Sequence, residues 1–195
     1  LWIVNPHSEG EKNKPLCIKL NNDLEWSNPV WIEDNHIPAY EPSEIAFDLH
    51  NNVWIGYMYT TFYGNEAEIY SPGGIRYVKI NNIDDPLDDV WKYNPLEYIY
   101  SNCASTTEDV LKNNEVDIYS IDIGSDQYGN TILWSISENG IMGYVINFNY
   151  LNNNQLQVIP LNCNFYFSDL PFDANSKIRV DNLNNAWIAY NGGIK

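Results

Sequence analysis

A short pattern that recurs three times constrains the fold of this chain more than any other feature of its sequence. The first copy occupies residues 48–54, and the fullest copy occupies residues 181–193. A third copy begins at Asp126, and its tryptophan, Trp134, comes two residues later than in the other copies. Internal repetition indicates a repeat architecture, which decides the fold before any local prediction of helix or strand.

Each copy combines an Asp, an Asn four residues later and a Trp that opens an apolar run, and the complete copies add a Gly six residues after the Trp. An Asp side chain accepts hydrogen bonds from the backbone N–H groups of its own turn. A residue that recurs once in every unit therefore indicates turn chemistry rather than catalysis or metal binding. The residues of this structural repeat are Asp48, Asn52, Trp54, Asp126, Asn130, Trp134, Gly140, Asp181, Asn185, Trp187 and Gly193.

The spacing of the units predicts an all-β fold made of β-propeller blades. Units of about 40 to 50 residues, each with about four short strands, match propeller blades, and no window shows a helical stripe. A sandwich of irregular strands is the alternative. The tryptophans that mark the units are spaced by 52, 80 and 53 residues, and they are Trp2, Trp54, Trp134 and Trp187.

We predict a partial propeller of about three to four four-stranded blades, with residues 1–195 forming part of one domain. An open arc of blades would leave apolar faces and strand edges in water, so further chain or a partner is expected to cover them. The chain is therefore interpreted as a fragment of a longer one. The expected blades are residues 1–37 (incomplete), 38–100, 101–172 and 173–195 (incomplete).

An aromatic insertion separates Trp54 from the Gly that completes its unit. Trp54 and Gly74 are twenty residues apart, whereas the other copies have six. The extra residues are predicted to form a lengthened hairpin, whose aromatic side chains offer the rigid amphipathic surface found at interfaces. A hairpin folded over its own blade is the alternative. The candidate binding residues are Tyr57, Tyr59, Phe62, Tyr63 and Tyr70.

The charge of the chain narrows the classes of partner. It has 26 acidic and 10 basic residues and a net charge of -16. Nucleic acids and anionic membranes require clustered Lys and Arg, so neither is expected, whereas cationic partners or divalent ions are favoured. One acidic loop offers weak calcium candidates, although its spacing is not that of an EF-hand and a solvated loop is the favoured interpretation. These candidates are Asp84, Asp85, Asp88 and Asp89.

No pattern in the sequence indicates an enzyme, so no catalytic residue and no cofactor other than calcium is expected. The histidines form no metal-ligand pair, and nucleophile-elbow, P-loop and dinucleotide motifs are absent from the sequence. No apolar run reaches the roughly 18 residues of a membrane helix. The cysteines allow two interpretations, three buried thiols or one disulfide with one free thiol. They are Cys17, Cys103 and Cys163.

The repeated pattern resembles the two-component-regulator propeller repeat of bacterial surface and periplasmic proteins. The resemblance covers most of the chain, although each motif is short, and it implies the fold more than the activity. Two residues are inserted before the Trp in the copy that begins at Asp126. The matching residues are Asp48, Asn51, Asn52, Trp54, Ile55, Gly56, Asp126, Gly129, Asn130, Trp134, Asn139, Gly140, Asp181, Asn184, Asn185, Trp187, Gly192 and Gly193.

A narrower resemblance rests on residues 1–5, residues 14–16 and Trp26, and on residues 73–75 followed by an acidic loop and Trp91. These segments are similar to the PorZ-like propeller component of the type IX secretion surface complex in Bacteroidetes. The resemblance implies a noncatalytic docking or surface-assembly module in the periplasm or on the cell surface of a Gram-negative bacterium. Its partners would be other envelope proteins or the rest of its own chain, without direct membrane insertion. The alternative is a periplasmic oligosaccharide-sensing propeller of a hybrid two-component sensor kinase, with a glycan as ligand.

Overall fold

The chain folds into antiparallel β-sheets. The computed structural model describes residues 2–3, 16–17, 23–27, 30–31, 41–58, 60–63, 68–71, 73–81, 90–92, 117–147, 157–161 and 166–194. Within these ranges every regular element is a strand, which confirms the predicted all-β class. The same ranges contain no helix of the length and hydrophobicity needed to cross a membrane.

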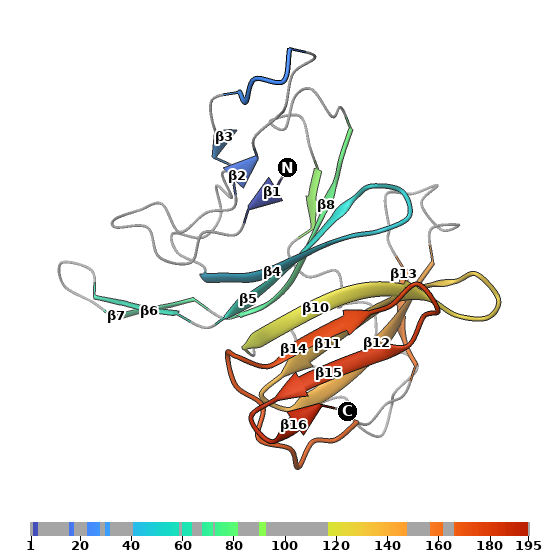
Figure 1. Cartoon of the computed structure of the whole chain (residues 1–195). Helices are drawn as coiled ribbons and strands as arrows, with labels where there is room; N and C mark the ends of the chain where they lie inside the picture. The colour runs from blue at the N-terminus through green and yellow to red at the C-terminus, as the bar shows by residue number, and fades with distance from the viewer. Residues whose placement is uncertain are drawn as a thin grey trace.

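Four sheets follow one another along the described chain, and each is a meander whose strands pair in order (Figure 1). The first sheet contains β1 (Trp2–Ile3), β2 (Leu16–Cys17) and β3 (Val30–Trp31). The second contains β4 (Glu41–Phe47), β5 (Val53–Met58), β8 (Gly74–Lys79) and β9 (Val90–Lys92). The third contains β10 (Ile118–Ser125), β11 (Thr131–Ser137), β12 (Gly140–Asn147) and β13 (Gln157–Pro160). The fourth contains β14 (Lys177–Val180), β15 (Ala186–Tyr190) and β16 (Gly193–Ile194).

These sheets do not close into a ring within the described part of the chain (Figure 1). The second and third sheets have four strands each, whereas three strands are described in the first and the fourth. Each sheet lies within one of the ranges expected for a blade, which are 1–37, 38–100, 101–172 and 173–195. Between β5 and β8, the strands β6 (Thr60–Tyr63) and β7 (Glu68–Ser71) pair as a separate hairpin.

The turn between the first two strands of a sheet has the same backbone conformation in three sheets. Three residues after its Asp, each turn contains a residue with positive φ: Asn51 at 62°, Gly129 at 81° and Asn184 at 64°. Asn and Gly tolerate this left-handed region better than other residues do. Gly129 therefore replaces Asn without changing the turn.

A second recurrent position opens the third strand of each of these sheets. The first residue of that strand is a Gly with positive φ, and it pairs with the residue three positions after the Trp. The same pairing occurs in the second sheet, although a hairpin is inserted between the two residues. The insertion therefore extends the connection without changing the register of the sheet. The pairs are Tyr57 with Gly74, Ser137 with Gly140 and Tyr190 with Gly193.

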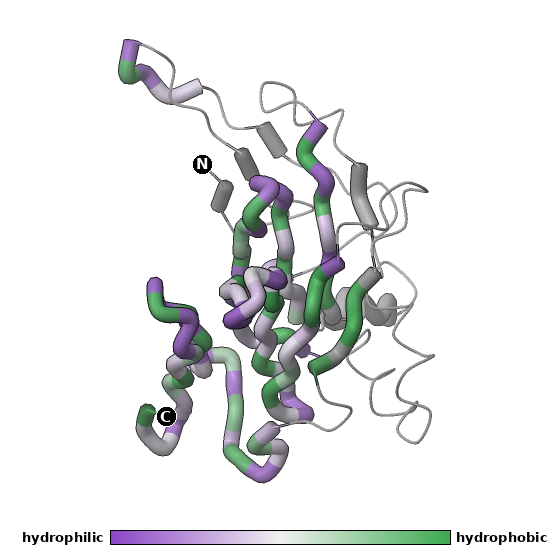
Figure 2. Tube along the Cα trace, turned by 90° about the vertical axis from the view of Figure 1, so that its right-hand side faces the viewer, coloured by the Kyte–Doolittle hydropathy of each residue, from purple (hydrophilic) through white to green (hydrophobic). Residues whose placement is uncertain are grey.

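The second and third sheets pack through one apolar cluster. Trp54 and Tyr77 are buried, with ring centroids 4.8 Å apart, and they share the cluster with Leu133 and Tyr144. Side chains that alternate along a strand point to opposite faces, and apolar and polar residues alternate visibly along several strands (Figure 2). Every second residue of a strand therefore enters this interface.

A β-bulge adjusts β10 to this cluster. Ile118 and Ile121 both belong to it although they are three residues apart, because the register shifts between Ile118 and Ser120. The extra residue, Tyr119, packs instead against the cluster between the third and fourth sheets. A bulge of this kind re-aims side chains at the end of a strand.

The third and fourth sheets pack through a separate cluster. Ile136 of β11 meets Ile178 of β14 and Ile188 of β15, with Trp134 packed beside them. Trp54 and Trp134 thus each lie on the face that meets the following sheet. Trp187 lies on the opposite face of β15 from Ile188 and is 53% exposed. The Trp face of the fourth sheet is therefore open among the described residues.

Candidate functional site

The turn at Asp48 is a closed hydrogen-bonded box. Its Oδ1 atom accepts hydrogen bonds from the backbone N–H groups of His50 and Asn52, each at 2.9 Å. Its Oδ2 atom accepts from the Asn52 amide at 3.2 Å and from Trp54 Nε1 at 3.1 Å. Asp48 and Asn52 are both buried. The motif thus joins the turn to the tryptophan that packs in the core.

The other two copies show what the spacing between Asp and Trp controls. Asp181 repeats the box and accepts a hydrogen bond from Trp187 Nε1 at 2.8 Å. Asp126 accepts from the backbone N–H of Asn130 at 2.8 Å and from its side-chain amide at 2.7 Å. No bond joins Asp126 to Trp134 among the described contacts, because two extra residues move Trp134 one strand period further from the turn. In all three copies the Asp is committed to its own turn.

These hydrogen bonds hold the exposed carboxylates in their charged form. The indole N–H of Trp187, and next the amide of Asn185, keep the pKa of Asp181 far below its ordinary value. The side-chain amide of Asn130 is the largest cause of the lowered pKa of Asp126. Donated hydrogen bonds favour the ionised form of a carboxyl group, which explains both directions.

We predict that Asp181 makes the stability of the fold sensitive to acid. Its pKa is lower in the folded state, so its contribution is complete above the ordinary Asp pKa of about 4 and is lost as the pH falls below it. The variant Asp181→Asn should therefore show a smaller drop in its urea midpoint between neutral and acidic pH than the parent protein. Asp169→Asn, which changes an exposed carboxylate, is the control, and an equal change in both variants would contradict the prediction.

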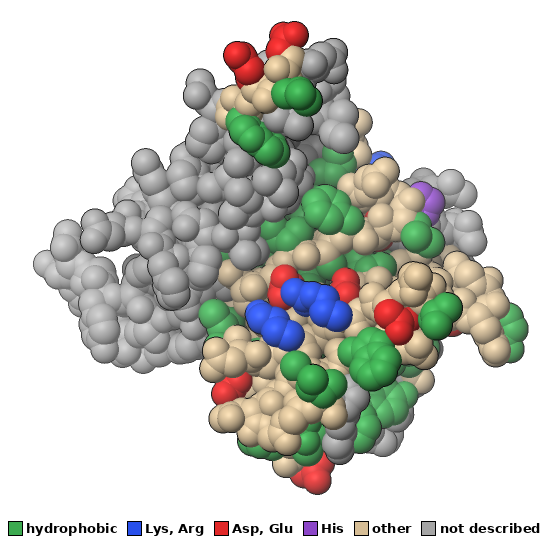
Figure 3. Space-filling model, viewed as in Figure 1, with side chains coloured by type: hydrophobic (Ala, Val, Ile, Leu, Met, Phe, Trp, Pro, Cys, Tyr) green, Lys and Arg blue, Asp and Glu red, His purple; other side chains and the backbone are tan. Residues whose placement is uncertain are grey.

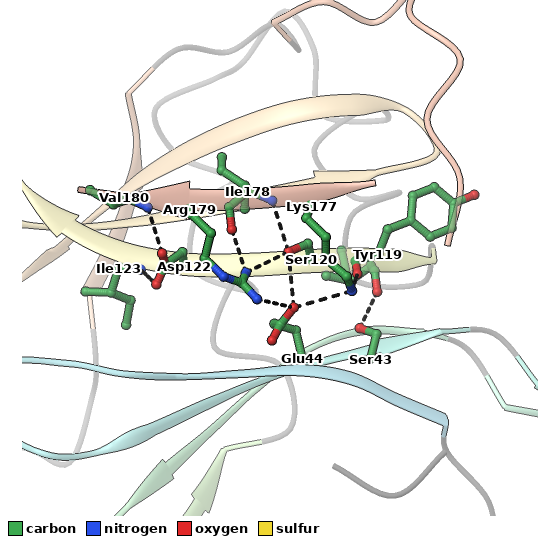
Figure 4. Close-up of polar contacts among 11 residues, drawn as sticks. Ser43, Glu44, Tyr119, Ser120, Asp122, Ile123, Lys177, Ile178, Arg179 and Val180 are labelled. Atoms are coloured by element: carbon green, nitrogen blue, oxygen red, sulfur yellow. Dashed lines mark hydrogen bonds and ion pairs between the residues drawn. The ribbon is translucent and has the colours of Figure 1, made fainter. Parts of the chain in front are cut away.

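A polar cluster lies where the first strands of three sheets meet, between β4, β10 and β14 (Figure 4). The Oε2 atom of Glu44 lies 3.4 Å from Lys177 Nζ and 3.1 Å from Arg179 Nη2. It also accepts a hydrogen bond from Ser120 Oγ at 3.4 Å. Glu44 and Arg179 are 135 residues apart in sequence. One carboxylate oxygen thus connects the second sheet to the fourth across the third. We call Glu44, Ser120, Asp122, Lys177 and Arg179 the first-strand cluster.

Side chains of β10 also bind the free backbone edge of β14. Asp122 Oδ2 accepts from the N–H of Val180 at 2.7 Å, and Ser120 Oγ accepts from the N–H of Ile178 at 3.2 Å. On the other side, the Ser43 hydroxyl donates to the carbonyl of Ile118. Buried backbone groups require such partners, and here side chains replace a neighbouring strand. The labelled residues in Figure 4 show that the three strands run in the same direction.

The charges of this cluster are partly open to solvent. The side chains of Lys177 and Arg179 are 40% and 55% exposed, and that of Glu44 is 17% exposed. Figure 3 shows Lys and Arg side chains beside acidic ones near the centre of this face. Ser120, by contrast, is fully buried and its hydroxyl is bound on two sides. The arrangement can hold three sheets together and can offer cationic groups to solvent.

We predict that Glu44→Gln weakens the attachment of the fourth sheet. A shared pair of this exposure contributes about 1 kcal/mol, so the free energy of unfolding should fall by about that amount. High salt should reduce the difference from the parent protein, because salt screens exposed charge pairs. Equilibrium urea unfolding at low and high salt measures both effects. Glu138→Gln, in the exposed β11–β12 turn, should change little, and an equal loss there would contradict the prediction.

The sequence-predicted binding residues are mostly outside what the structure describes. Tyr57 is 1% exposed and packs with Val53 and Val78, with Arg76 Cζ 5.7 Å from its ring centroid, so it belongs to the core rather than to a surface. This places Tyr57 away from any exposed binding surface. Tyr59 and the calcium candidates Asp84, Asp85, Asp88 and Asp89 lie outside the described residues, as do Cys103 and Cys163. Only the backbone is described for Cys17, Phe62, Tyr63 and Tyr70.

The first-strand cluster was not predicted from the sequence. One signal pointed to it: the position four residues before the Asp of each turn is charged in every copy, as Glu44, Asp122 and Lys177. A charged residue inside an apolar strand needs a partner. Aligning the copies on their Asp residues would have brought these three positions together.

The comparisons with known proteins identify no relative of this chain. No protein-family model, curated protein or solved structure matches it. Among the described side chains, no group of three or more His, Cys, Asp and Glu residues could hold a metal ion. A functional proposal therefore rests on the residues and their geometry.

Proposed function

We propose that this chain is part of a β-propeller that serves as a noncatalytic docking module. The support is the order of packing, in which the Trp face of one sheet meets the next sheet. The first strands β4, β10 and β14 lie side by side and run in parallel, which is the arrangement expected of blades around an axis. This proposed architecture agrees with the resemblance of the sequence to propeller repeats.

The single observation that carries the docking role is the open Trp face of the fourth sheet. Trp54 is fully buried, whereas Trp187 at the same repeat position is 53% exposed, and Ile194 beside it in the sheet is 75% exposed. Ala189, which pairs with Ile194, is exposed as well. Arg179 pairs with Trp187 on the same face, so this apolar surface has a cation beside it. Exposed apolar patches mark interaction surfaces.

The internal interfaces indicate the kind of surface that this face accepts. Trp54 is covered by a sheet face that includes Leu133 and Tyr144. Trp134 meets one that includes Ile188 and Tyr190. The open face should therefore receive a sheet face of the same mixed aliphatic and aromatic kind, and we propose that another envelope protein supplies it. The periplasm or the cell surface is the location that we propose, following the resemblance of the repeat.

Site-specific photo-crosslinking in the native cells tests this function. A photo-crosslinking amino acid at position 194 should give one dominant product, and mass spectrometry should identify a β-strand of another protein in it. Leu24 is the matched control site, because it is 76% exposed and Ile194 is 75% exposed. A crosslinked product at both position 194 and position 24, or at neither, would contradict docking through this face. A product at position 194 that contains only this protein's own sequence would contradict it as well.

A further inference from the structure

The three Asp turns present apolar side chains that the turns do not need. Leu49 is 69% exposed, Tyr128 is 81% exposed and Leu183 is 77% exposed. Each lies one or two residues after its Asp, where only the backbone takes part in the hydrogen bonds of the turn. Polar residues would serve at these positions equally well. Tyr128 and Leu183 occupy the same position of their turns, whereas Leu49 stands one residue earlier. Each turn thus has an exposed apolar tip that its hydrogen bonds do not explain.

The backbone that carries the tips is ordered by hydrogen bonds. The N–H of Tyr128 donates to Asp126 Oδ1 at 2.8 Å, and the N–H of Leu183 donates to Asp181 Oδ1 at 2.8 Å. In the first turn Leu49 lies between Asp48 and His50, whose N–H donates to Asp48 at 2.9 Å. A surface residue that is already ordered loses little conformational entropy on binding. The backbone at the tips is thus preorganised.

All three turns lie at the same end of the fold. They follow β4, β10 and β14, which run in the same direction (Figure 4), and the turns gather on the right-hand side of Figure 1. The end of β10 is joined to the third turn, because the N–H of Ser125 donates to Asn184 Oδ1 at 3.0 Å. We call residues 48–52, 126–130 and 181–185 the turn rim.

The turn rim is negatively charged. It contains Asp48, Asp126 and Asp181 but neither Lys nor Arg. Hydrogen bonds within the turns keep the pKa of Asp126 and that of Asp181 below their ordinary values, so both remain ionised at neutral pH. The chain as a whole carries a net charge of -16. An opposite charge on the partner would increase the association rate and favour this face over others.

We infer that the turn rim docks a cationic protein segment in which Lys or Arg residues alternate with apolar side chains. The apolar tips would anchor that segment, and the negative charges of Asp126 and Asp181 would favour its cationic groups, whereas Asp48 is buried. This inference rests on the proposed docking function and adds a second surface to it, distinct from the open Trp face.

Titration of the isotope-labelled full chain with short synthetic peptides tests the inference. The probe is a peptide of alternating Lys and Leu, and the control peptides alternate Lys with Ser and Glu with Leu. The Lys–Leu peptide should shift the amide resonances of the turn rim and should bind at least about tenfold more tightly than either control, because it alone has both anchors and charge. Equal binding of the Lys–Ser peptide, or shifts that map elsewhere, would overturn the inference.

Two sets of substitutions complete the test. The triple variant Leu49→Ser, Tyr128→Ser and Leu183→Ser should lose about tenfold in affinity for the Lys–Leu peptide while its unfolding midpoint stays unchanged, because all three side chains are exposed. The variant Leu24→Ser changes an equally exposed apolar residue elsewhere and should bind normally. Unchanged binding by the triple variant would overturn the turn rim as a docking surface. The crosslink from position 194 would still report on the proposed function separately.

Discussion

Replacing Asp48 with alanine is expected to lower the free energy of unfolding by roughly 3 to 5 kcal/mol, because it leaves several buried donors without an acceptor. The N–H and amide of Asn52 and the indole N–H of Trp54 all donate to this carboxylate. Asp48 is 4% exposed and Asn52 is 6% exposed, so water cannot readily replace the lost bonds. Equilibrium urea unfolding followed by tryptophan fluorescence measures the loss.

The middle copy of the repeat provides the matched control for this substitution. Asp126→Ala removes the same turn interactions, but Asn130 is exposed and no indole N–H donates to Asp126 among the described contacts. Water can therefore satisfy the freed donors, and the loss should be much smaller than that caused by Asp48→Ala. Equal losses in the two variants would show that the turn bonds, and not their burial, determine the effect.

The parts of the fold that the sequence predicted depend on interactions between near neighbours. The Asp turn closes within seven residues, from Asp48 to Trp54, and its chemistry recurs at Asp181. A local pattern of this kind can be recognised because Asp, Asn and Gly each have one specific backbone role. The sheets themselves follow from apolar runs separated by these turns.

The parts that were not predicted depend on long-range placement. Glu44 and Arg179 meet only because two interfaces bring the second and fourth sheets together, and no local spacing encodes that contact. Tyr57 shows a different limit. It was grouped with the aromatic insertion, yet it continues the period-2 alternation of Val53 and Ile55, and that alternation places it in the core.

Trp54 and Trp187 occupy the same position in the repeat, so the same substitution at each should separate packing within the chain from docking. Trp54→Ala should lower the free energy of unfolding by about 3 to 5 kcal/mol, because the side chain is fully buried. Trp187→Ala should cost about 1 kcal/mol, because the side chain is 53% exposed.

The functional consequence should be the reverse of the effect on stability. Trp187→Ala is expected to remove the crosslink formed from position 194, because Trp187 is the largest apolar group on the open face. Urea unfolding of both variants and crosslinking of Trp187→Ala in the native cells measure the two effects. If Trp187→Ala lowers the free energy of unfolding as much as Trp54→Ala does, Trp187 serves packing within the chain. If the crosslink from position 194 survives in Trp187→Ala, this face does not bind a partner through its tryptophan. The comparison therefore tests directly whether the uncovered tryptophan of the fourth sheet belongs to a binding surface.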